Sequence, residues 1–426
     1  MTGTKQLLVF AKQRLAAFRE ELARLEHSEF PYPAAEAALQ RIQQVFTQHS
    51  QMLDLLGDKS DPNTVNQVCQ QQLKDLWDYL PFLGFILRST NVRNAFEIYV
   101  PLQRLAWRIL GPNIQLLLSS EWNYSPFIYT QIPLLPRFVI IGIPAHESGN
   151  PLVAPLAGHE LGHALWCEVV EKSLWHPAFL GRLKASILSN IRAPAQWPKF
   201  KKLFDVAKPE DLETLLFATA AWSPAFNWAQ RQTEEYFCDF VGLRLFGDSF
   251  LFAFAHLLSP VLEGRRALHY PNMIRRVRFQ LQAARQYGIT APNDYESWFQ
   301  DRDEPSDDDQ REKFLVELAD KAADELVPEL ITHADSLLRQ PGLPNWSTEE
   351  GVKVHTDAVE RIYDDFCLVA PSEKAGHLAN ILNAGWKATM NNIPEILEHS
   401  SQTVLRELIL KSIEVMEFET KNPLPA

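Results

Sequence analysis

Two histidines and a glutamate at helical spacing are the residues of this chain best suited to chemistry. They lie in LAGHELGHALW (156–166) as His159, Glu160 and His163. Residues four apart in a helix share one face, with Cβ atoms about 5–6 Å apart, so both imidazoles can bind one ion. Glu160 is then placed to take a proton from a water that the ion activates, and Gly162 leaves room for a neighbouring backbone or a substrate. The alternative is two core histidines that happen to flank a glutamate.

A third ligand is predicted from RQTEEYFCDFVGLRLFG (231–247). Glu235 and Asp239 are also four apart, and a second helix packed against the first could present Glu235 to the metal. Asp239 could then hold His159 or His163 through its far ring nitrogen, as metal-bound histidines usually require. The alternative is a solvated acidic pair. The apolar residues around the pair favour burial, and buried carboxylates are costly unless paired or metal-bound.

HELGH followed by ExxxD on a second helix resembles the gluzincin branch of zinc metallopeptidases, above all the group of HtpX and the CAAX prenyl proteases. The resemblance covers roughly residues 137–281 and implies a zincin-like core with Zn²⁺ as cofactor. A later His-Pro element ending in arginine is similar to HYPNMIRRVRFQL (269–281). It implies that His269 reaches the substrate carbonyl or the oxyanion, with Arg275 assisting or bracing the site. Tyr270 separates His269 from the proline, and a helix-capping or core histidine is an equal alternative.

The function predicted from these residues is peptide-bond hydrolysis by an endopeptidase. His159, His163 and Glu235 would hold Zn²⁺, Glu160 would act as the general base, and a peptide or protein would be the substrate. One alternative is a zinc-stabilised helical interaction protein with little or no catalysis. Another is a protease kept latent until a partner or signal activates it. The further partners considered are a regulatory protein and self-association through the helical regions.

The fold predicted to position these residues is mainly α-helical with a small β-sheet, a zincin-like core carrying helical extensions at both ends. The sequence divides into a helical N-terminal region at 1–110, a zincin-like catalytic core at 111–290, an acidic linker at 301–312 and a helical C-terminal region at 313–426. The N-terminal region begins with two amphipathic helices joined by a turn rich in proline, typical of an antiparallel hairpin.

Two segments rich in β-branched and aromatic residues precede the HELGH helix and are predicted strands. They are IQLLLSSEWNYSPFIY (114–129) and PRFVIIGIP (136–144). The second occupies the place where zincins commonly have the edge strand that lines the cleft, and an edge strand can pair with an extended peptide. Its continuously apolar pattern favours an interior strand equally well.

Composition narrows the classes of partner. The chain has 426 residues and a formal net charge of −12, which argues against nucleic acid or an anionic membrane as the main partner, because both need a basic surface. The four cysteines contain no CxxC pair, so a reducing compartment fits best. No apolar run reaches the roughly 20 residues of a membrane span. We therefore expect a cytoplasmic protein without a membrane span.

Overall fold

The computed structural model describes most of the chain. The residues described are 3–57, 60–90, 95–123, 125–259, 266–301, 309–339, 343–365, 377–391 and 399–421. They form two compact units. The N-terminal unit comprises Met1–Gln103 and Gly111–Gly149, and the C-terminal unit comprises Arg104–Leu110 and Asn150–Ala426. The predicted mainly helical class with a small sheet is confirmed.

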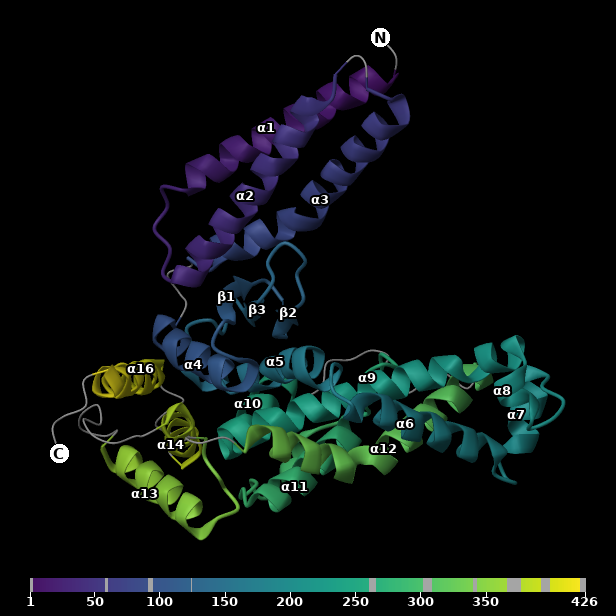
Figure 1. The fold of residues 1–426 in the computed structure, drawn as a ribbon. Helices are drawn as coiled ribbons and strands as arrows, with labels where there is room; N and C mark the ends of the chain where they lie inside the picture. The colour runs from purple at the N-terminus through teal and green to yellow at the C-terminus, as the bar shows by residue number, and fades with distance from the viewer. Residues whose placement is uncertain are drawn as a thin grey trace. The chain divides into compact units, whose positions relative to one another are not determined.

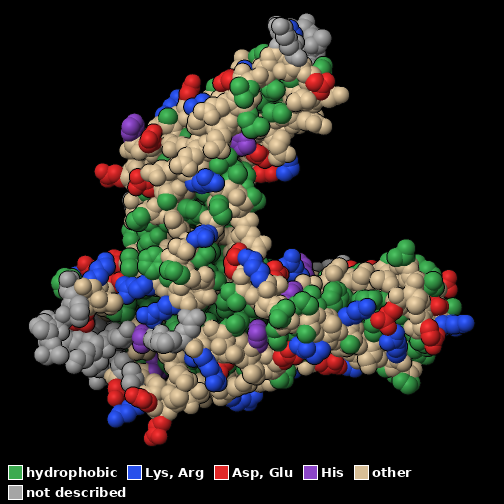
Figure 2. All heavy atoms as spheres, in the orientation of Figure 1, with side chains coloured by type: hydrophobic (Ala, Val, Ile, Leu, Met, Phe, Trp, Pro, Cys, Tyr) green, Lys and Arg blue, Asp and Glu red, His purple; other side chains and the backbone are tan. Residues whose placement is uncertain are grey.

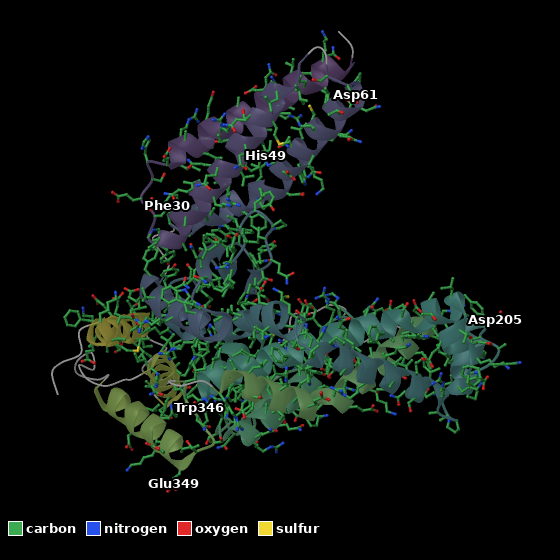
Figure 3. All side chains as sticks on the ribbon, viewed as in Figure 1. Phe30, His49, Asp61, Asp205, Trp346 and Glu349 are labelled. Atoms are coloured by element: carbon green, nitrogen blue, oxygen red, sulfur yellow. The ribbon has the colours of Figure 1, made fainter. Side chains whose placement is uncertain are left out.

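The N-terminal unit contains helices followed by the sheet. Its elements are α1 (Gly3–Leu25), α2 (Pro33–Leu55), α3 (Pro62–Arg88), the 3₁₀ turn η1 (Phe96–Ile98), the first residues of α4 (Tyr99–Leu110), β1 (Gln115–Glu121), β2 (Phe127–Tyr129) and β3 (Phe138–Pro144). The predicted pair of N-terminal helices is present, and α3 packs against both (Figure 1). Asp61, labelled in Figure 3, starts α3 by accepting a hydrogen bond from the Thr64 amide at 2.9 Å.

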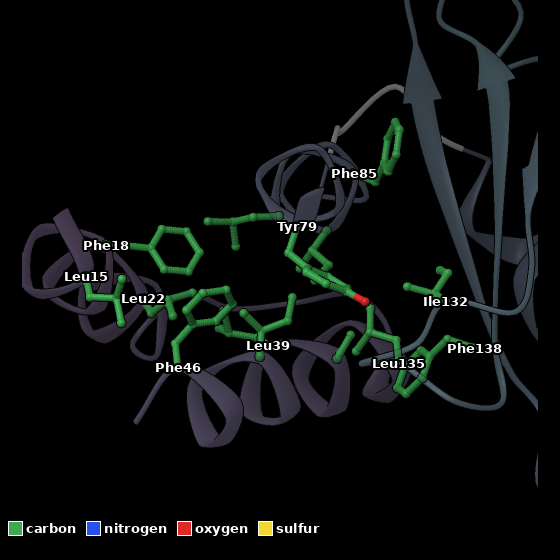
Figure 4. Packing of buried hydrophobic residues seen from close by; sticks show 14 of the residues in the cluster. Leu15, Phe18, Leu22, Leu39, Phe46, Tyr79, Phe85, Ile132, Leu135 and Phe138 are labelled. Atoms are coloured by element: carbon green, nitrogen blue, oxygen red, sulfur yellow. The ribbon is translucent and has the colours of Figure 1, made fainter. Parts of the chain in front are cut away.

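Apolar side chains at helical spacing make the core of this unit. Leu15, Phe18 and Leu22 of α1 meet Phe46 of α2 in the cluster drawn in Figure 4. The rings of Phe18 and Phe46 pack edge to face with centroids 4.8 Å apart. The cluster continues to Phe138 at the start of β3. The sheet therefore shares a core with the N-terminal helices, because its apolar residues complete the same cluster.

The sheet has three strands in the order β1-β3-β2. β1 pairs with β3 in parallel, with Gln115 opposite Phe138, and β2 pairs with β3 antiparallel, with Phe127 opposite Gly142. The segment predicted as one strand at 114–129 is thus two strands. β3 is the central strand, so the prediction of a free edge strand at 136–144 was wrong and the interior alternative is confirmed. Both edges of β3 already form main-chain hydrogen bonds, with β1 on one side and β2 on the other. An extended peptide therefore has no free edge of β3 to pair with.

The C-terminal unit is almost entirely helical. Besides the end of α4 it contains η2 (Pro151–Val153), α5 (Leu156–Leu165), the π-helical turn η3 (Trp166–Val170), α6 (Trp175–Arg192), α7 (Trp197–Phe204), α8 (Asp211–Thr214), α9 (Leu216–Phe246), α10 (Asp248–Leu258), α11 (Met273–Tyr287), η4 (Tyr295–Trp298), α12 (Gln310–Leu338), α13 (Glu349–Asp365), α14 (Leu378–Asn391) and α16 (His399–Lys421). Helix α9 is its central element and packs against α5, α6, α11 and α12 (Figure 1). Every residue of 232–246 is buried, so this half of α9 is enclosed on all sides.

The C-terminal helices belong to the same unit as the HELGH helix. Small residues of α12, Ala319, Ala322 and Ala323, are fully buried, and α12 packs along α9. Trp346, labelled in Figure 3, donates its indole N–H to the carbonyl of Arg244 on α9 at 3.2 Å. Within residues 111–290 the boundary between the units lies at residues 149 and 150, so this predicted core is divided between them. The predicted region 313–426 is continuous with the helices that follow residue 150.

The predicted acidic linker at 301–312 lies mostly outside the described residues. Its last residues, 310–312, form the first turn of α12. Within the part of the chain that is described, no helix combines the length and the apolar character needed to cross a membrane. On the face shown in Figure 2, acidic and basic side chains are interspersed.

Candidate metal centre

Two glycines bring the HELGH helix close to α9. A Cβ added to Gly162 would lie 2.7 Å from the Cα of Cys238, and one added to Gly158 would lie 3.0 Å from the Cα of Gly242. Backbone can approach backbone this closely only where a side chain is absent. The neighbouring backbone expected over Gly162 is therefore α9. Cys238 is fully buried in this contact, and burial raises the pKa of its thiol well above the usual value.

His159, His163 and Glu235 are brought together as predicted. One ligand atom from each lies within 4.8 Å of the other two. The Nε2 atom of His159 is 3.5 Å from Glu235 Oε2, and that of His163 is 3.6 Å from Glu235 Oε1. Ligand atoms around a tetrahedral zinc are about 3.3–3.6 Å apart when each bond is about 2.0–2.2 Å long. The separation between each imidazole and the nearer carboxylate oxygen is therefore compatible with one zinc ion.

Each histidine is held through its other ring nitrogen by a carboxylate of α9. Asp239 Oδ1 lies 2.8 Å from His159 Nδ1. Of the two histidines that Asp239 was predicted to hold, the one it contacts is therefore His159. Glu234 Oε1 lies 2.9 Å from His163 Nδ1. Acceptors in this position set the tautomer, so that both Nε2 atoms can offer a lone pair to a metal.

Glu234 is a residue that the sequence reasoning missed. It directly precedes Glu235 in the segment TEEYFCD, and neighbouring helical residues differ by about 100° in direction. Both can therefore face α5 from one side of α9. One signal could have identified Glu234. Each metal-bound histidine usually needs a hydrogen-bond acceptor at its other ring nitrogen, and Asp239 can serve only one of the two. Arg231, three residues earlier, contacts Glu234 Oε2 at 2.9 Å.

Arg276, rather than the predicted Arg275, braces the acidic residues. Its Nε donates to Asp239 Oδ2 at 2.6 Å and its Nη2 to Asp239 Oδ1 at 2.8 Å. The same Nη2 lies 3.2 Å from Glu235 Oε2. Gln280, one turn further along α11, donates to Asp239 Oδ2 at 2.9 Å. Every oxygen of the buried Asp239 is thus satisfied.

Arg275 points elsewhere, which corrects its predicted bracing role. Its guanidinium pairs with Asp324 of α12 at 2.6 Å, and its side chain is 42% exposed. Successive residues of α11 point in directions about 100° apart. Only one of the two arginines can therefore reach into the site. The rotation of α11 about its axis, relative to α9, determines which arginine this is.

Opposing charges dominate the electrostatics of the centre. Burial lowers the pKa of His159, but hydrogen bonds to Asp239 and Glu235 outweigh burial and raise it to about 10. Burial raises the pKa of Glu235, but the contact with His159 and the charge of Arg276 outweigh burial and lower it to about 2. The carboxylates thus favour positive charge between them. A divalent cation bound by these residues would satisfy that demand in place of a proton on the imidazole.

Glu160 lies on α5 between the two histidines and is buried. Burial raises the pKa of its carboxyl, and the charges of His159 and His163 oppose that effect. The raised pKa makes this carboxylate a stronger proton acceptor than an exposed one, as a general base requires.

His269 is exposed, and its ring packs against that of Tyr270 with centroids 4.6 Å apart. Its contact with a substrate oxyanion stays a prediction. The residue directly before Pro271 is Tyr270, and Arg276 follows that proline by five residues.

Comparison with known proteins gives no relative. No protein-family model matches the chain, and no curated protein or solved structure matches it significantly. The resemblance to gluzincins thus rests on the motifs themselves, and functional inference rests on the geometry of the site.

Proposed function

We propose that this protein is a zinc-dependent endopeptidase. The observation that carries the proposal is the convergence of His159, His163 and Glu235 on α5 and α9, at separations that suit one zinc ion. Support comes from the carboxylate on the far nitrogen of each histidine. Such acceptors accompany metal-bound histidines and raise their basicity.

The number of ligands favours a catalytic site. Structural zinc sites are usually closed by four protein ligands, whereas catalytic sites have three and an open position. Among the described residues, three such side chains converge here. Glu160, on the helix that carries both histidines, adds a carboxylate that a structural site does not need.

The roles of the residues follow from their positions. His159, His163 and Glu235 would hold the ion, which when bound supplies Lewis-acid activation of water and of a peptide carbonyl. Glu160 would take a proton from the attacking water and deliver it to the amine that leaves. Asp239 and Glu234 would keep the imidazoles oriented, and Arg276 would offset the negative charge of Asp239 and Glu235.

The test compares Glu160→Gln with a matched carboxylate variant on full-length zinc-loaded protein. Glu171 is exposed and lies eleven residues further along, so Glu171→Gln is the control. We expect Glu160→Gln to retain one zinc per chain and lose cleavage of a quenched-fluorescent peptide library, while Glu171→Gln cleaves like wild type. Unchanged turnover in Glu160→Gln, or zinc well below one per chain in wild type, would refute the proposal.

A zinc-stabilised interaction protein is the second candidate. It is favoured by large apolar side chains exposed on the N-terminal helices, including Phe10, Leu55 and Trp77, since exposed apolar groups often bind partners. Removal of zinc separates the two functions. A structural ion contributes folding free energy outright, so its loss would unfold the C-terminal unit. A catalytic ion would leave a folded but inactive protein.

A further inference from the structure

The two histidines of the candidate metal centre are braced in the same way but not equally well. Each imidazole contacts a carboxylate of α9, and each carboxylate contacts an arginine. For His159 the carboxylate is Asp239 and the arginine is Arg276, which donates to both carboxylate oxygens. The side chains of Asp239 and Arg276 are 0% and 9% exposed. The contacts behind His159 are therefore shielded from water.

The contacts behind His163 reach the solvent. Glu234 Oε1 lies 2.9 Å from His163 Nδ1, and Glu234 Oε2 accepts a hydrogen bond from Arg231 Nη1 at 2.9 Å. The side chain of Glu234 is 8% exposed, whereas that of Arg231 is 67% exposed. Water and salt can thus reach the arginine, while the carboxylate that it holds is enclosed.

The orientation of the Glu234 carboxylate depends on few contacts. Among the described residues, its side-chain hydrogen-bonding partners are His163 on one oxygen and Arg231 on the other. Asp239 has a further partner besides its histidine and arginine, because Gln280 also donates to it. Arg231 lies three residues before Glu234, at the spacing that puts two helical side chains on one face. Loss of Arg231 would leave Glu234 held by the imidazole alone.

We propose that Arg231 is a positioning residue of the metal centre. It fixes the Glu234 carboxylate in the orientation that accepts a hydrogen bond from His163 Nδ1, and so keeps His163 Nε2 directed at the metal. Because Arg231 is exposed, salt weakens its hold on Glu234, so the orientation of His163 depends on ionic strength and that of His159 does not. The inference rests on the metal site of the proposed function and holds whichever bond the protein cleaves.

The sign of one measurement separates positioning from simple charge repulsion. A guanidinium near a cation also repels it, although water and salt attenuate this effect at an exposed group. Repulsion alone predicts that zinc binds more tightly once the arginine is removed. Positioning predicts weaker binding, because the imidazole of His163 loses its fixed orientation.

The first experiment measures zinc affinity of the full-length protein by competition with a chromogenic chelator. We expect Arg231→Gln to weaken the affinity by about two- to fivefold, as suits an ion pair with one exposed partner, and Arg231→Lys to recover most of this loss. Arg192→Gln is the matched control, because Arg192 is also exposed but pairs with Glu213, and it should equal wild type. Unchanged or tighter binding in Arg231→Gln would overturn the proposal.

Salt tests the exposed part of the contact. Raising the salt from about 0.05 to about 1 M shortens the Debye length to about 3 Å. The ratio of the zinc affinities of wild type and Arg231→Gln should then fall toward one. A ratio that stays constant over this range would contradict the dependence on ionic strength.

The second experiment adds Arg231→Gln to Glu234→Gln. Without the carboxylate there is nothing for the arginine to hold, so the second substitution should not change zinc affinity further. A general effect of Arg231 on the stability of α9 would instead weaken binding equally in both backgrounds, and that outcome would refute the positioning role.

Failure of this inference is distinguishable from failure of the proposed function. If wild type binds one zinc and cleaves peptides while Arg231→Gln matches its affinity, only the role of Arg231 is overturned. If wild type binds one zinc but cleaves no peptide, the peptidase function fails and the affinities still decide the role of Arg231. If wild type binds no zinc, both fail together.

Discussion

The close approach of α5 to α9 at Gly162 predicts that one added methyl group will disturb the metal centre. In Gly162→Ala the new Cβ would lie 2.7 Å from the Cα of Cys238, whereas ordinary contacts begin at 3.4 Å. The helices must therefore separate by about 0.7 Å. Overpacking of this kind costs about 1–3 kcal/mol. The proposed zinc ligands lie on these two helices. Because zinc bonds tolerate only about 0.2 Å, zinc affinity should fall by at least about tenfold.

Gly181 supplies the matched control. It lies within α6 on an exposed surface, and a Cβ there meets nothing within 4 Å. Gly181→Ala should stabilise the protein by about 0.5–1 kcal/mol through helix propensity, with zinc affinity unchanged. Thermal unfolding of the zinc-free proteins should therefore place Gly162→Ala below wild type and Gly181→Ala above it. Competition with a chromogenic chelator measures the affinity. If Gly162→Ala matches wild type in both assays, close helix contact does not position the ligands.

Four further predictions concern the groups around the ligands. Asp239→Asn and Glu234→Gln should each weaken zinc binding by about 10–100-fold; an affinity equal to that of wild type in chelator competition would contradict the roles given to these carboxylates. Arg276→Ala should cost about 3–5 kcal/mol in urea unfolding of the zinc-free protein, because it removes the buried guanidinium that pairs with the buried carboxylates of Asp239 and Glu235. Arg275→Ala should cost at most about 1 kcal/mol, as expected for a half-exposed pair, and equal losses for both arginines would refute this distinction. In the zinc-free protein the folded pKa of His159, about 10, exceeds its ordinary value of 6.5. This group's contribution to stability is therefore fully present below pH 6.5 and lost as pH rises toward 10, so the fall in melting temperature over that range should be smaller in His159→Gln, and identical profiles would contradict it.

The spacing of the motifs predicted the candidate ligand set, and the structure brings these residues together. His159 and His163 share a face because four residues make about one helical turn, and the same rule applies to Glu235 and Asp239. These are local consequences of backbone geometry, and they hold wherever the helices lie. The apolar residues around Glu235 also predicted that this part of α9 would be buried, as it is. The N-terminal helices followed likewise from a local apolar periodicity.

Tertiary packing decided the pairings. The choice of Asp239 for His159 and of Glu234 for His163 depends on the register of α5 against α9, which Gly158 and Gly162 set through backbone contact. Whether Arg275 or Arg276 enters the site depends on the rotation of α11, which no local pattern specifies. The sheet joins the N-terminal helices because its apolar residues complete their core. A sequence can show which side chains share a face, but partners across elements are selected by the packing that buries those faces.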